Sequence, residues 1–130
     1  MRNVTHLNEL VRLLNWGYKD NKEVITVNYS KFFSKVLEQL VLAGLIKSFQ
    51  VNNKQIQILL GVSLSGRKGR FIFKNISLPG ILVVYSLAKL VELKRKRPDL
   101  VLFLYTSEGI LTNSRAIEKR IGGKALFEVL

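Results

Sequence analysis

The sequence predicts an α+β fold made of two small subdomains. In the N-terminal half, two segments place apolar residues at the spacing of an amphipathic helix, whereas most of the C-terminal half consists of short apolar and β-branched segments. A Leu-Pro-Gly turn at 78–80 divides the two halves. We therefore expect an N-terminal α-β-α-β-β subdomain over residues 1–77 and a mostly β subdomain with short helices over residues 78–130.

The N-terminal subdomain is expected to contain two helices. Residues 4–18 have helical apolar spacing, Thr5 is a suitable cap, and Gly17 weakens the last turn. The second helix begins after Ser30, which can cap it, and ends near Gly44, where a left-handed backbone conformation is favoured. Its buried stripe is predicted to consist of Phe33, Val36, Leu37, Leu40 and Val41.

Short strands complete this half. Residues 23–27 are rich in β-branched side chains and predict one strand. Residues 45–51 and 55–60 flank Asn52 and Asn53, which predicts a β-hairpin.

The second half begins with two strands and a helix. Residues 70–77 and 81–86 predict strands on either side of the Leu-Pro-Gly turn. A helix is expected over residues 87–97, because the residue before Pro98 is disfavoured in a helix.

The last segments predict a sheet interrupted by one short helix. Residues 100–105 are fully apolar, which indicates a central strand, and residues 109–111 continue the sheet after a turn at 108–109. Thr112 or Asn113 is expected to start a helix of about two turns, because both residue types cap helices. The glycine pair at 122–123 is expected to end this helix, and residues 124–130 predict a final strand.

The charge balance indicates the class of partner. The 130 residues include 21 Lys and Arg against 9 Asp and Glu, a formal net charge of +12. A compact fold with this excess repels itself, so a polyanion is the expected partner, with nucleic acid ahead of an anionic membrane surface. The sequence has neither a secretory signal pattern nor an apolar stretch of transmembrane length, so we expect a soluble intracellular protein without membrane partners.

The residue types that serve catalysis and metal binding are scarce. His6 is the only histidine, there is no cysteine, and the acidic residues are scattered over predicted surface positions. A histidine-based triad, a thiolate metal site and a pair of catalytic carboxylates are therefore disfavoured. We expect no enzymatic activity, no cofactor, no metal and no small-molecule substrate.

Two basic segments are candidate phosphate contacts. The loop at 61–69 follows a predicted strand, but the residues after its last glycines do not match a phosphate-binding loop, so nucleotide binding is disfavoured. Its cations Arg67 and Lys68, with the following Arg70, suit contacts to a nucleic-acid backbone. The run KRKR at 94–97 is either such a contact or a solvated helix end, where cations complement the helix dipole.

The segment YTSEGILTNSRAIEKRIGG at 105–123 combines hydroxyls, glycines and basic residues. No Glu or Gln stands three residues after Thr112 or Asn113, so the start of the short helix keeps its positive partial charge beside Arg115. The glycines would allow a ligand to approach the backbone closely. The segment is therefore either turn chemistry or an anion-binding surface. Trp16 and Tyr18 have two similar alternatives, stacking on bases or covering the edge of the core.

The segment TSEGILTNSRAIEKRIGG is similar to the C-terminal signature of the universal small-subunit ribosomal protein S-eight family. In that signature, hydroxyl residues, a basic residue and a glycine precede two apolar residues, Thr-Asp, a short helix, Gly-Gly-Glu and a closing strand. The segments SKFFSKVLEQLVLAGLIKSFQV and SLPGI resemble further landmarks of the family in the same order. The resemblance covers nearly the whole chain.

The resemblance implies a structural protein of the small ribosomal subunit. Members of the family bind the central domain of small-subunit rRNA early in assembly, and their C-terminal subdomain holds an irregular loop of an RNA hairpin. Small-subunit rRNA and neighbouring small-subunit proteins are thus the expected partners, and an RNA-binding regulator outside the ribosome is the alternative. The predicted RNA-binding residues, from the resemblance and from the basic segments together, are Ser30, Lys31, Arg67, Lys68, Arg70, Tyr105, Thr106, Ser107, Gly109, Thr112, Arg115, Gly122, Gly123 and Lys124.

Four positions depart from the family pattern. Tyr105 replaces a serine and adds a ring that can stack on a base, while Glu108 replaces a basic residue. Lys124 replaces the Glu after Gly-Gly, and Leu78 replaces the Arg before proline. These changes imply a diverged member whose RNA partner differs locally. The composition, with few alanines, is typical of AT-rich organellar genomes, so a mitochondrial matrix ribosome is favoured over one in a bacterial cytoplasm or a plastid.

Overall fold

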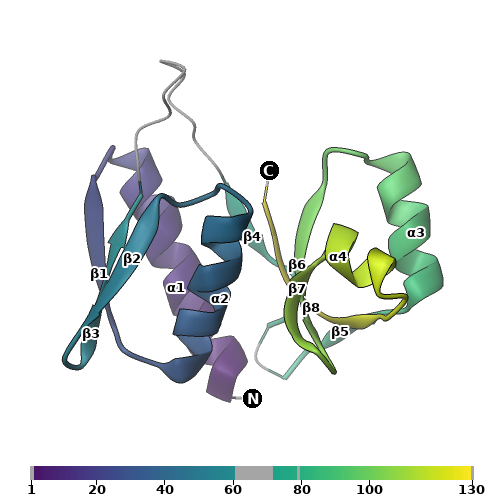
Figure 1. Ribbon diagram of the computed structural model, residues 1–130, viewed down its shortest axis with the longest axis horizontal. Helices are drawn as coiled ribbons and strands as arrows, with labels where there is room; N and C mark the ends of the chain where they lie inside the picture. The colour runs from purple at the N-terminus through teal and green to yellow at the C-terminus, as the bar shows by residue number, and fades with distance from the viewer. Residues whose placement is uncertain (1, 61–71, 79, 130) are drawn as a thin grey trace. The chain divides into compact units, whose positions relative to one another are not determined.

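The computed structural model describes residues 2–60, 72–78 and 80–129, together with the side chains from residue 6 onward within these ranges. The chain divides into two compact units (Figure 1). The N-terminal unit is Glu9–Ile72, and the C-terminal unit is Phe73–Leu130 together with Met1–Asn8. The described part of the chain has four helices and eight strands, which confirms the predicted α+β class.

Both predicted helices of the first half are present. Helix α1 spans Arg2–Lys19, so Thr5 lies inside the helix and the prediction that it caps the first turn is wrong. Helix α2 spans Lys31–Leu42, and the Ser30 side chain accepts a hydrogen bond from the backbone N–H of Phe33, as expected for a cap. After α2, Gly44 has a φ of 75°, which confirms its predicted left-handed conformation.

The sheet of the N-terminal unit has three antiparallel strands, β1 (Val24–Asn28), β2 (Ser48–Asn52) and β3 (Gln55–Leu59), in the order β1-β3-β2. The predicted hairpin is β2–β3, and its turn contains Asn53 with a φ of 55°. Every second residue of β1 and β3 is buried, and α1 and α2 lie on one face of the sheet (Figure 1). The opposite face is therefore the polar one.

Gly17 and Tyr18 position the end of α1 against the sheet. A Cβ atom on Gly17 would lie 2.7 Å from Leu60 Cδ1 and 2.9 Å from Ile25 Cγ2, so the glycine allows close packing. The buried Tyr18 hydroxyl donates to the backbone carbonyl of Leu45 and lies 3.4 Å from that of Leu60. Burial raises the pKa of Tyr18 to about 12, because the phenolate would lose its hydration. Of the two alternatives for Tyr18, the structure supports the core position.

The C-terminal unit has a five-stranded antiparallel sheet with two helices on one face (Figure 1). The strand order is β4-β8-β6-β7, and β5 also pairs with β8. The elements are β4 (Phe73–Asn75), β5 (Val83–Tyr85), α3 (Leu87–Lys96), β6 (Val101–Thr106), β7 (Gly109–Thr112), α4 (Asn113–Glu118) and β8 (Gly123–Val129). β6 lies between two neighbours, as predicted for a central strand.

The core of this unit lies between the sheet and its helices. Its buried residues are Leu90, Leu100, Leu102, Leu104, Ala116 and Ala125. Within the sheet, the rings of Phe103 and Phe127 stack with their centroids 4.8 Å apart, and Phe73 packs against Phe127 at 6.0 Å. Each fully buried aromatic or aliphatic side chain of this kind contributes about 1.5–3 kcal/mol to folding.

Ser77 and the turn after it hold β5 in place. The buried Ser77 hydroxyl donates to the Ala125 carbonyl and accepts from the N–H of Val83 at 3.0 Å. Leu78 and Ile81 exchange two backbone hydrogen bonds of 2.9 Å across the predicted turn. Because β4 pairs with β8, residues 73–75 belong to the sheet of the C-terminal unit. The subdomain boundary expected after residue 77 stays a prediction.

The end of α4 differs from the expectation. The helix ends at Glu118, and the left-handed residue that follows is Arg120, with a φ of 57°, rather than Gly122 or Gly123. The basic loop predicted at 61–69, with Arg67, Lys68 and the following Arg70, lies outside the described residues.

Candidate RNA-binding surface

The turn between β6 and β7 is shaped from within by Thr106. Its side chain is buried, and its hydroxyl donates to the Gly109 carbonyl at 2.8 Å and accepts from the N–H of Glu108 at 3.1 Å. Gly109 has a φ of 96°, which favours glycine. These contacts leave Ser107 exposed at the tip. Of the predicted contact residues here, Thr106 and Gly109 fix the shape of the turn and Ser107 is accessible to a ligand.

A cation that the sequence analysis missed accompanies this turn. The Lys119 ammonium lies 3.0 Å from the Glu108 carboxylate, and both side chains are about half exposed. Such an exposed ion pair stabilises the fold little. Its consequence is electrostatic, because Lys119 places a positive charge beside the acid that replaces a basic residue of the family pattern. The eleven-position separation explains why local patterns did not indicate it.

The start of α4 uses its polar residues for the fold. The Thr112 hydroxyl accepts from the N–H of Arg115 at 3.4 Å, so the helix start is capped and one fewer of its N–H groups is free to bind an anion. Helix α4 has only six residues. The Arg115 side chain is exposed, as expected for a residue available to phosphate.

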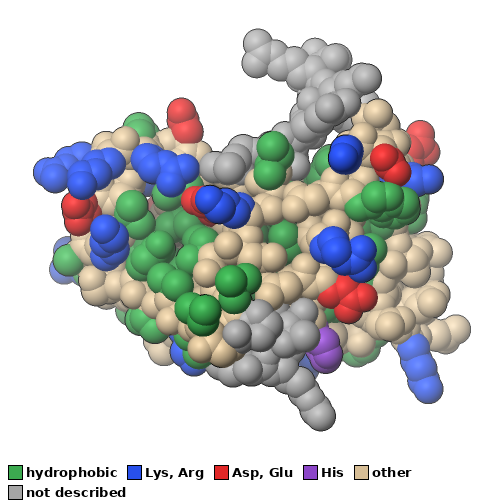
Figure 2. Space-filling model, turned by 180° about the vertical axis from the view of Figure 1, so that it is seen from behind, with side chains coloured by type: hydrophobic (Ala, Val, Ile, Leu, Met, Phe, Trp, Pro, Cys, Tyr) green, Lys and Arg blue, Asp and Glu red, His purple; other side chains and the backbone are tan. Residues whose placement is uncertain are grey.

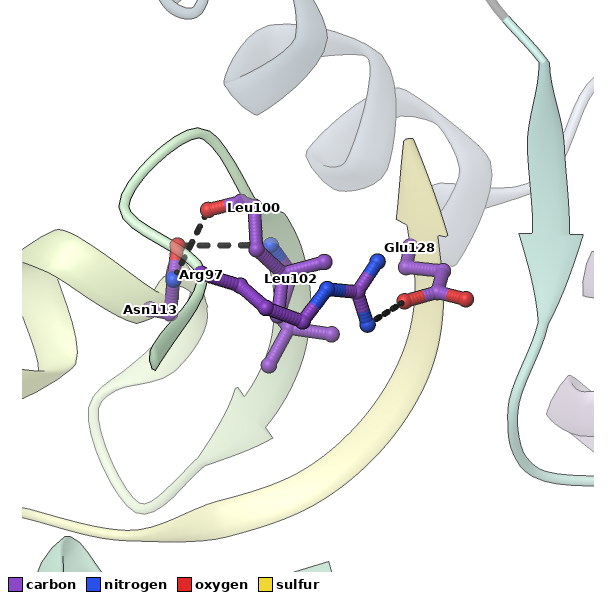
Figure 3. A network of polar contacts seen from close by, with 5 residues as sticks. All are labelled: Arg97, Leu100, Leu102, Asn113 and Glu128. Atoms are coloured by element: carbon purple, nitrogen blue, oxygen red, sulfur yellow. Dashed lines mark hydrogen bonds and ion pairs between the residues drawn. The ribbon is translucent and has the colours of Figure 1, made fainter. Parts of the chain in front are cut away.

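Asn113 joins α4 to the start of β6 and to Leu100, the residue before that strand (Figure 3). Only 2% of its surface is exposed. Its Nδ2 donates to the Leu100 carbonyl at 3.0 Å, and its Oδ1 accepts from the N–H of Leu102 at 3.3 Å. The pairing of β7 with β6 ends at Thr112, which is opposite Phe103. At the next position the backbone has turned into α4, and the Asn113 side-chain amide bonds to the backbone before and within β6 in place of a strand residue. Asn113 is therefore a structural residue and not the cap.

Gly122 and Gly123 accommodate the protein's own backbone. A Cβ atom on Gly122 would lie 2.4 Å from the carbonyl oxygen of Tyr85, and one on Gly123 would lie 2.7 Å from that of Tyr105. Both separations are far below a normal contact, so larger residues require the strands to move. The glycines were expected to allow close approach of a ligand, and the described neighbours are instead strands of the same sheet and, for Gly122, also the start of α3. RNA contact at these two positions stays a prediction.

Tyr105 and Lys124 lie side by side on the sheet. They are paired in register between β6 and β8, and Val84 of β5 pairs with Lys124 from the other side. Side chains opposite each other in adjacent strands share a face, so these three residues form one row. Tyr105 is 45% exposed and Lys124 is partly exposed. This row offers a ring, an ammonium group and an aliphatic surface to a ligand.

Three of the four cations in the run 94–97 have partners within the unit. Arg97 pairs with Glu128 at 3.6 Å (Figure 3), and Lys96 pairs with Glu92 at 2.8 Å. Lys94 donates to the Pro98 carbonyl and to the Ser114 hydroxyl, each at 3.2 Å. The Lys96–Glu92 pair raises the pKa of Lys96 and lowers that of Glu92, first through their hydrogen bond. These contacts favour the solvated helix end over a dedicated phosphate cluster.

The N-terminal unit holds the remaining predicted residues. Ser30 uses its hydroxyl as the cap of α2, and Lys31, the first residue of that helix, is exposed. Trp16 is 46% exposed, and the Lys22 ammonium lies 5.4 Å from the centre of its ring, a cation–π arrangement. On the face that Figure 2 shows, the Lys and Arg side chains of the described residues are spread out rather than gathered in one patch. Within the part of the chain that the structure describes, no helix has the length and apolar character needed to cross a membrane.

The fold and surface define a strongly basic α+β protein with an exposed polar turn on an antiparallel sheet. The family model described as Ribosomal protein S8 matches residues 6–130. The chain therefore belongs to the ribosomal protein S8 family.

Similar proteins come from several lineages. The chain is 30% identical over 124 residues to the small ribosomal subunit protein uS8m of Acanthamoeba castellanii, with 95% of this chain and 97% of that protein covered. It is 31% identical over 122 residues to uS8 of Mesomycoplasma hyopneumoniae strain 7448, covering 90% and 88%. It is 25% identical over 130 residues to uS8c of Pelargonium hortorum, covering 95% and 96%.

Proposed function

We propose that this protein is a structural constituent of the small ribosomal subunit. The observation that carries the proposal is the match of the Ribosomal protein S8 model to residues 6–130. The net charge of +12 supports it, because a ribosomal protein lies against the phosphate backbone of RNA. The role is architectural rather than catalytic, and its partners are small-subunit rRNA and neighbouring small-subunit proteins.

The RNA partner in this proposal is an irregular hairpin in the central domain of small-subunit rRNA. Regular RNA helices hide their base edges in a deep, narrow groove, so proteins recognise distorted loops. The exposed turn and row of the C-terminal unit suit such a loop, since Ser107 offers a hydroxyl, Tyr105 a ring and Lys124 a positive charge, and Arg115 of α4 adds a further positive charge. Thr106, Gly109, Thr112, Gly122 and Gly123 contribute by fixing this shape.

Binding of this hairpin would support assembly of the subunit and hence translation. The similarity to the uS8m relative supports a mitochondrial ribosome as the location. Relatives with similar identity named uS8 and uS8c make a bacterial cytoplasm and a plastid the alternatives.

Sedimentation tests the ribosomal role. An epitope-tagged copy of the chain, expressed in its own cells, is expected in the small-subunit peak of a sucrose gradient, and the peak from purified organelles identifies the compartment. A tagged chain that binds RNA but stays out of this peak would refute the ribosomal role and favour the regulator outside the ribosome.

The proposed RNA surface has its own test. Arg115→Ala is expected to weaken binding to the rRNA hairpin several-fold. It should also make the negative slope of the logarithm of the binding constant against the logarithm of the salt concentration shallower by about one, because one phosphate contact is lost. Arg12→Ala is the matched control, since it removes the same charge from an exposed position of α1. Equal affinities and salt slopes for the two variants would contradict the assignment of Arg115.

A further inference from the structure

Lys119 and Glu108 form an ion pair between two segments of the C-terminal unit. Their charged groups are 3.0 Å apart, and the side chains are 49% and 52% exposed, respectively. Lys119 directly follows α4, whereas Glu108 lies at the tip of the turn between β6 and β7. The pair therefore connects the turn that carries the exposed Ser107 with the helix that carries the exposed Arg115.

The backbone at both ends of this pair is fixed by other contacts. Beyond Lys119, the N–H of Ile121 donates to the Ala116 carbonyl at 3.0 Å, which closes the end of α4. The N–H of Glu108 donates to the Thr106 hydroxyl at 3.1 Å. An exposed ion pair adds little to stability, and both segments have their conformation defined without it. Stabilisation of the turn therefore explains the pair poorly.

The Lys119 ammonium can bind a second anion. An ammonium group has three N–H donors. Within the described residues its only polar partner is the Glu108 carboxylate, so donors remain for another ligand. The backbone of Lys119 is still helical, and Arg115 lies four positions earlier, so the two side chains are neighbours on one face of the helix. Both cations can thus meet phosphates of one RNA strand.

We propose that Lys119 binds a backbone phosphate of the rRNA hairpin while it neutralises Glu108. Without a cation beside it, the Glu108 carboxylate would repel phosphate from the tip of the turn, next to the Ser107 hydroxyl. An ammonium group between a carboxylate and a phosphate attracts both. Lys119 is thus the phosphate-binding residue, and Glu108 is a positioning residue that holds the ammonium near the tip.

This inference rests on the proposed function, because it adds a residue to the same RNA surface. The alternative explanation is two independent charges. A cation at a helix C-terminus is favoured by the helix dipole alone, and an acid near RNA weakens binding through its charge alone. The two explanations differ in one measurable quantity, which is the energetic coupling between positions 108 and 119.

Binding of four proteins to the rRNA hairpin measures this coupling, namely the wild-type chain, Glu108→Gln, Lys119→Gln and the double variant. Lys119→Gln is expected to weaken binding several-fold and to make the negative salt slope of the binding constant shallower by about one. Glu108→Gln should raise the affinity about two- to fivefold more in the Lys119→Gln background than in the wild-type background, because only there does the carboxylate lack its cation. Lys119→Arg keeps the charge and should keep the wild-type salt slope.

Two further variants serve as controls. Glu118→Gln removes an exposed acid of α4 that is next to Lys119 in the sequence, but adjacent residues of a helix do not face each other. Its effect on affinity should therefore be equal in both backgrounds. Lys19→Gln removes an exposed lysine from the last turn of α1 and should leave the salt slope unchanged.

Two results would overturn the inference. The first is a Lys119→Gln variant whose affinity and salt slope match those of Lys19→Gln, which would exclude the phosphate contact. The second is a Glu108→Gln change that alters the affinity by the same factor in both backgrounds, which would make the two charges independent. Failure of the wild-type chain to prefer the hairpin over a fully paired RNA of equal length would instead contradict the proposed function.

Discussion

Replacing Asn113 should destabilise the C-terminal unit by about 3 kcal/mol. The change Asn113→Ala removes two buried hydrogen bonds, to the Leu100 carbonyl at 3.0 Å and from the N–H of Leu102 at 3.3 Å. Removing one partner of a buried hydrogen bond costs roughly 1–3 kcal/mol for each backbone group left without a partner, so two such groups give about 2–6 kcal/mol. Because Leu100 and Leu102 are 5% and 1% exposed, water replaces the amide poorly, and a total of about 3 kcal/mol is a moderate value.

Urea unfolding monitored by circular dichroism measures this loss, and a fall in melting temperature of about 10 °C is the thermal equivalent for a chain of this size. Hydrogen exchange of the Leu102 amide should also accelerate in the variant, because its acceptor is removed. Ser114→Ala is the control, since Ser114 is exposed and its hydroxyl only accepts a bond from Lys94. An Asn113→Ala variant within 0.5 kcal/mol of the control, about the usual range of surface substitutions, would refute this account of the amide.

Two further predictions concern packing and pH. Gly122→Ala should destabilise the chain by about 1–3 kcal/mol, because its Cβ atom would meet the Tyr85 carbonyl oxygen at 2.4 Å. In the control Gly44→Ala, nothing lies within 4 Å of the new atom, so only the smaller cost of the left-handed backbone is expected. Equal losses of stability in urea unfolding would contradict the steric explanation. The pKa of Tyr18 is raised from 10.0 to about 12, so the stability that the neutral phenol contributes is fully present below pH 10 and should fall by up to about 3 kcal/mol as the pH rises toward 12. Tyr18→Phe should lack this part of the pH dependence. Stability curves of the two proteins that run parallel between pH 8 and 11.5 would contradict the burial of the phenol.

Local signals in the sequence predicted most of the elements. The cap at Ser30, the left-handed Gly44 and the hairpin at Asn53 each depend on residues within a few positions, so short patterns specify them. The failure at Thr5 has the same local origin, because a capping residue type can also lie inside a helix when the apolar pattern extends further. Signals of this kind place elements well and fix their ends less well.

The roles of the glycines and of Asn113 could not be predicted in this way. A glycine in a sequence indicates backbone freedom or close approach, and only the tertiary structure says which one and to what. Gly122 approaches Tyr85, and Gly17 approaches Leu60, which are 37 and 43 positions away along the chain. Asn113 is of a residue type that caps helices, but Thr112 is the cap here, and the Asn113 amide instead bonds to β6. Long-range neighbours of this kind leave no local pattern.

Residues that shape the C-terminal unit and residues that are exposed to a ligand have different consequences for how the chain would recognise RNA. Most positions of segment 105–124 that match the family pattern, such as Thr106, Thr112 and Gly122, have their atoms occupied within the sheet and its turns, and Ser107 is the exposed exception. The departures Tyr105, Glu108 and Lys124 lie at exposed or partly exposed positions. A substitution there changes a contact without changing the backbone that presents it. The altered ring and charges should therefore shift which nucleotides this protein contacts, while the shape of the proposed RNA surface is retained.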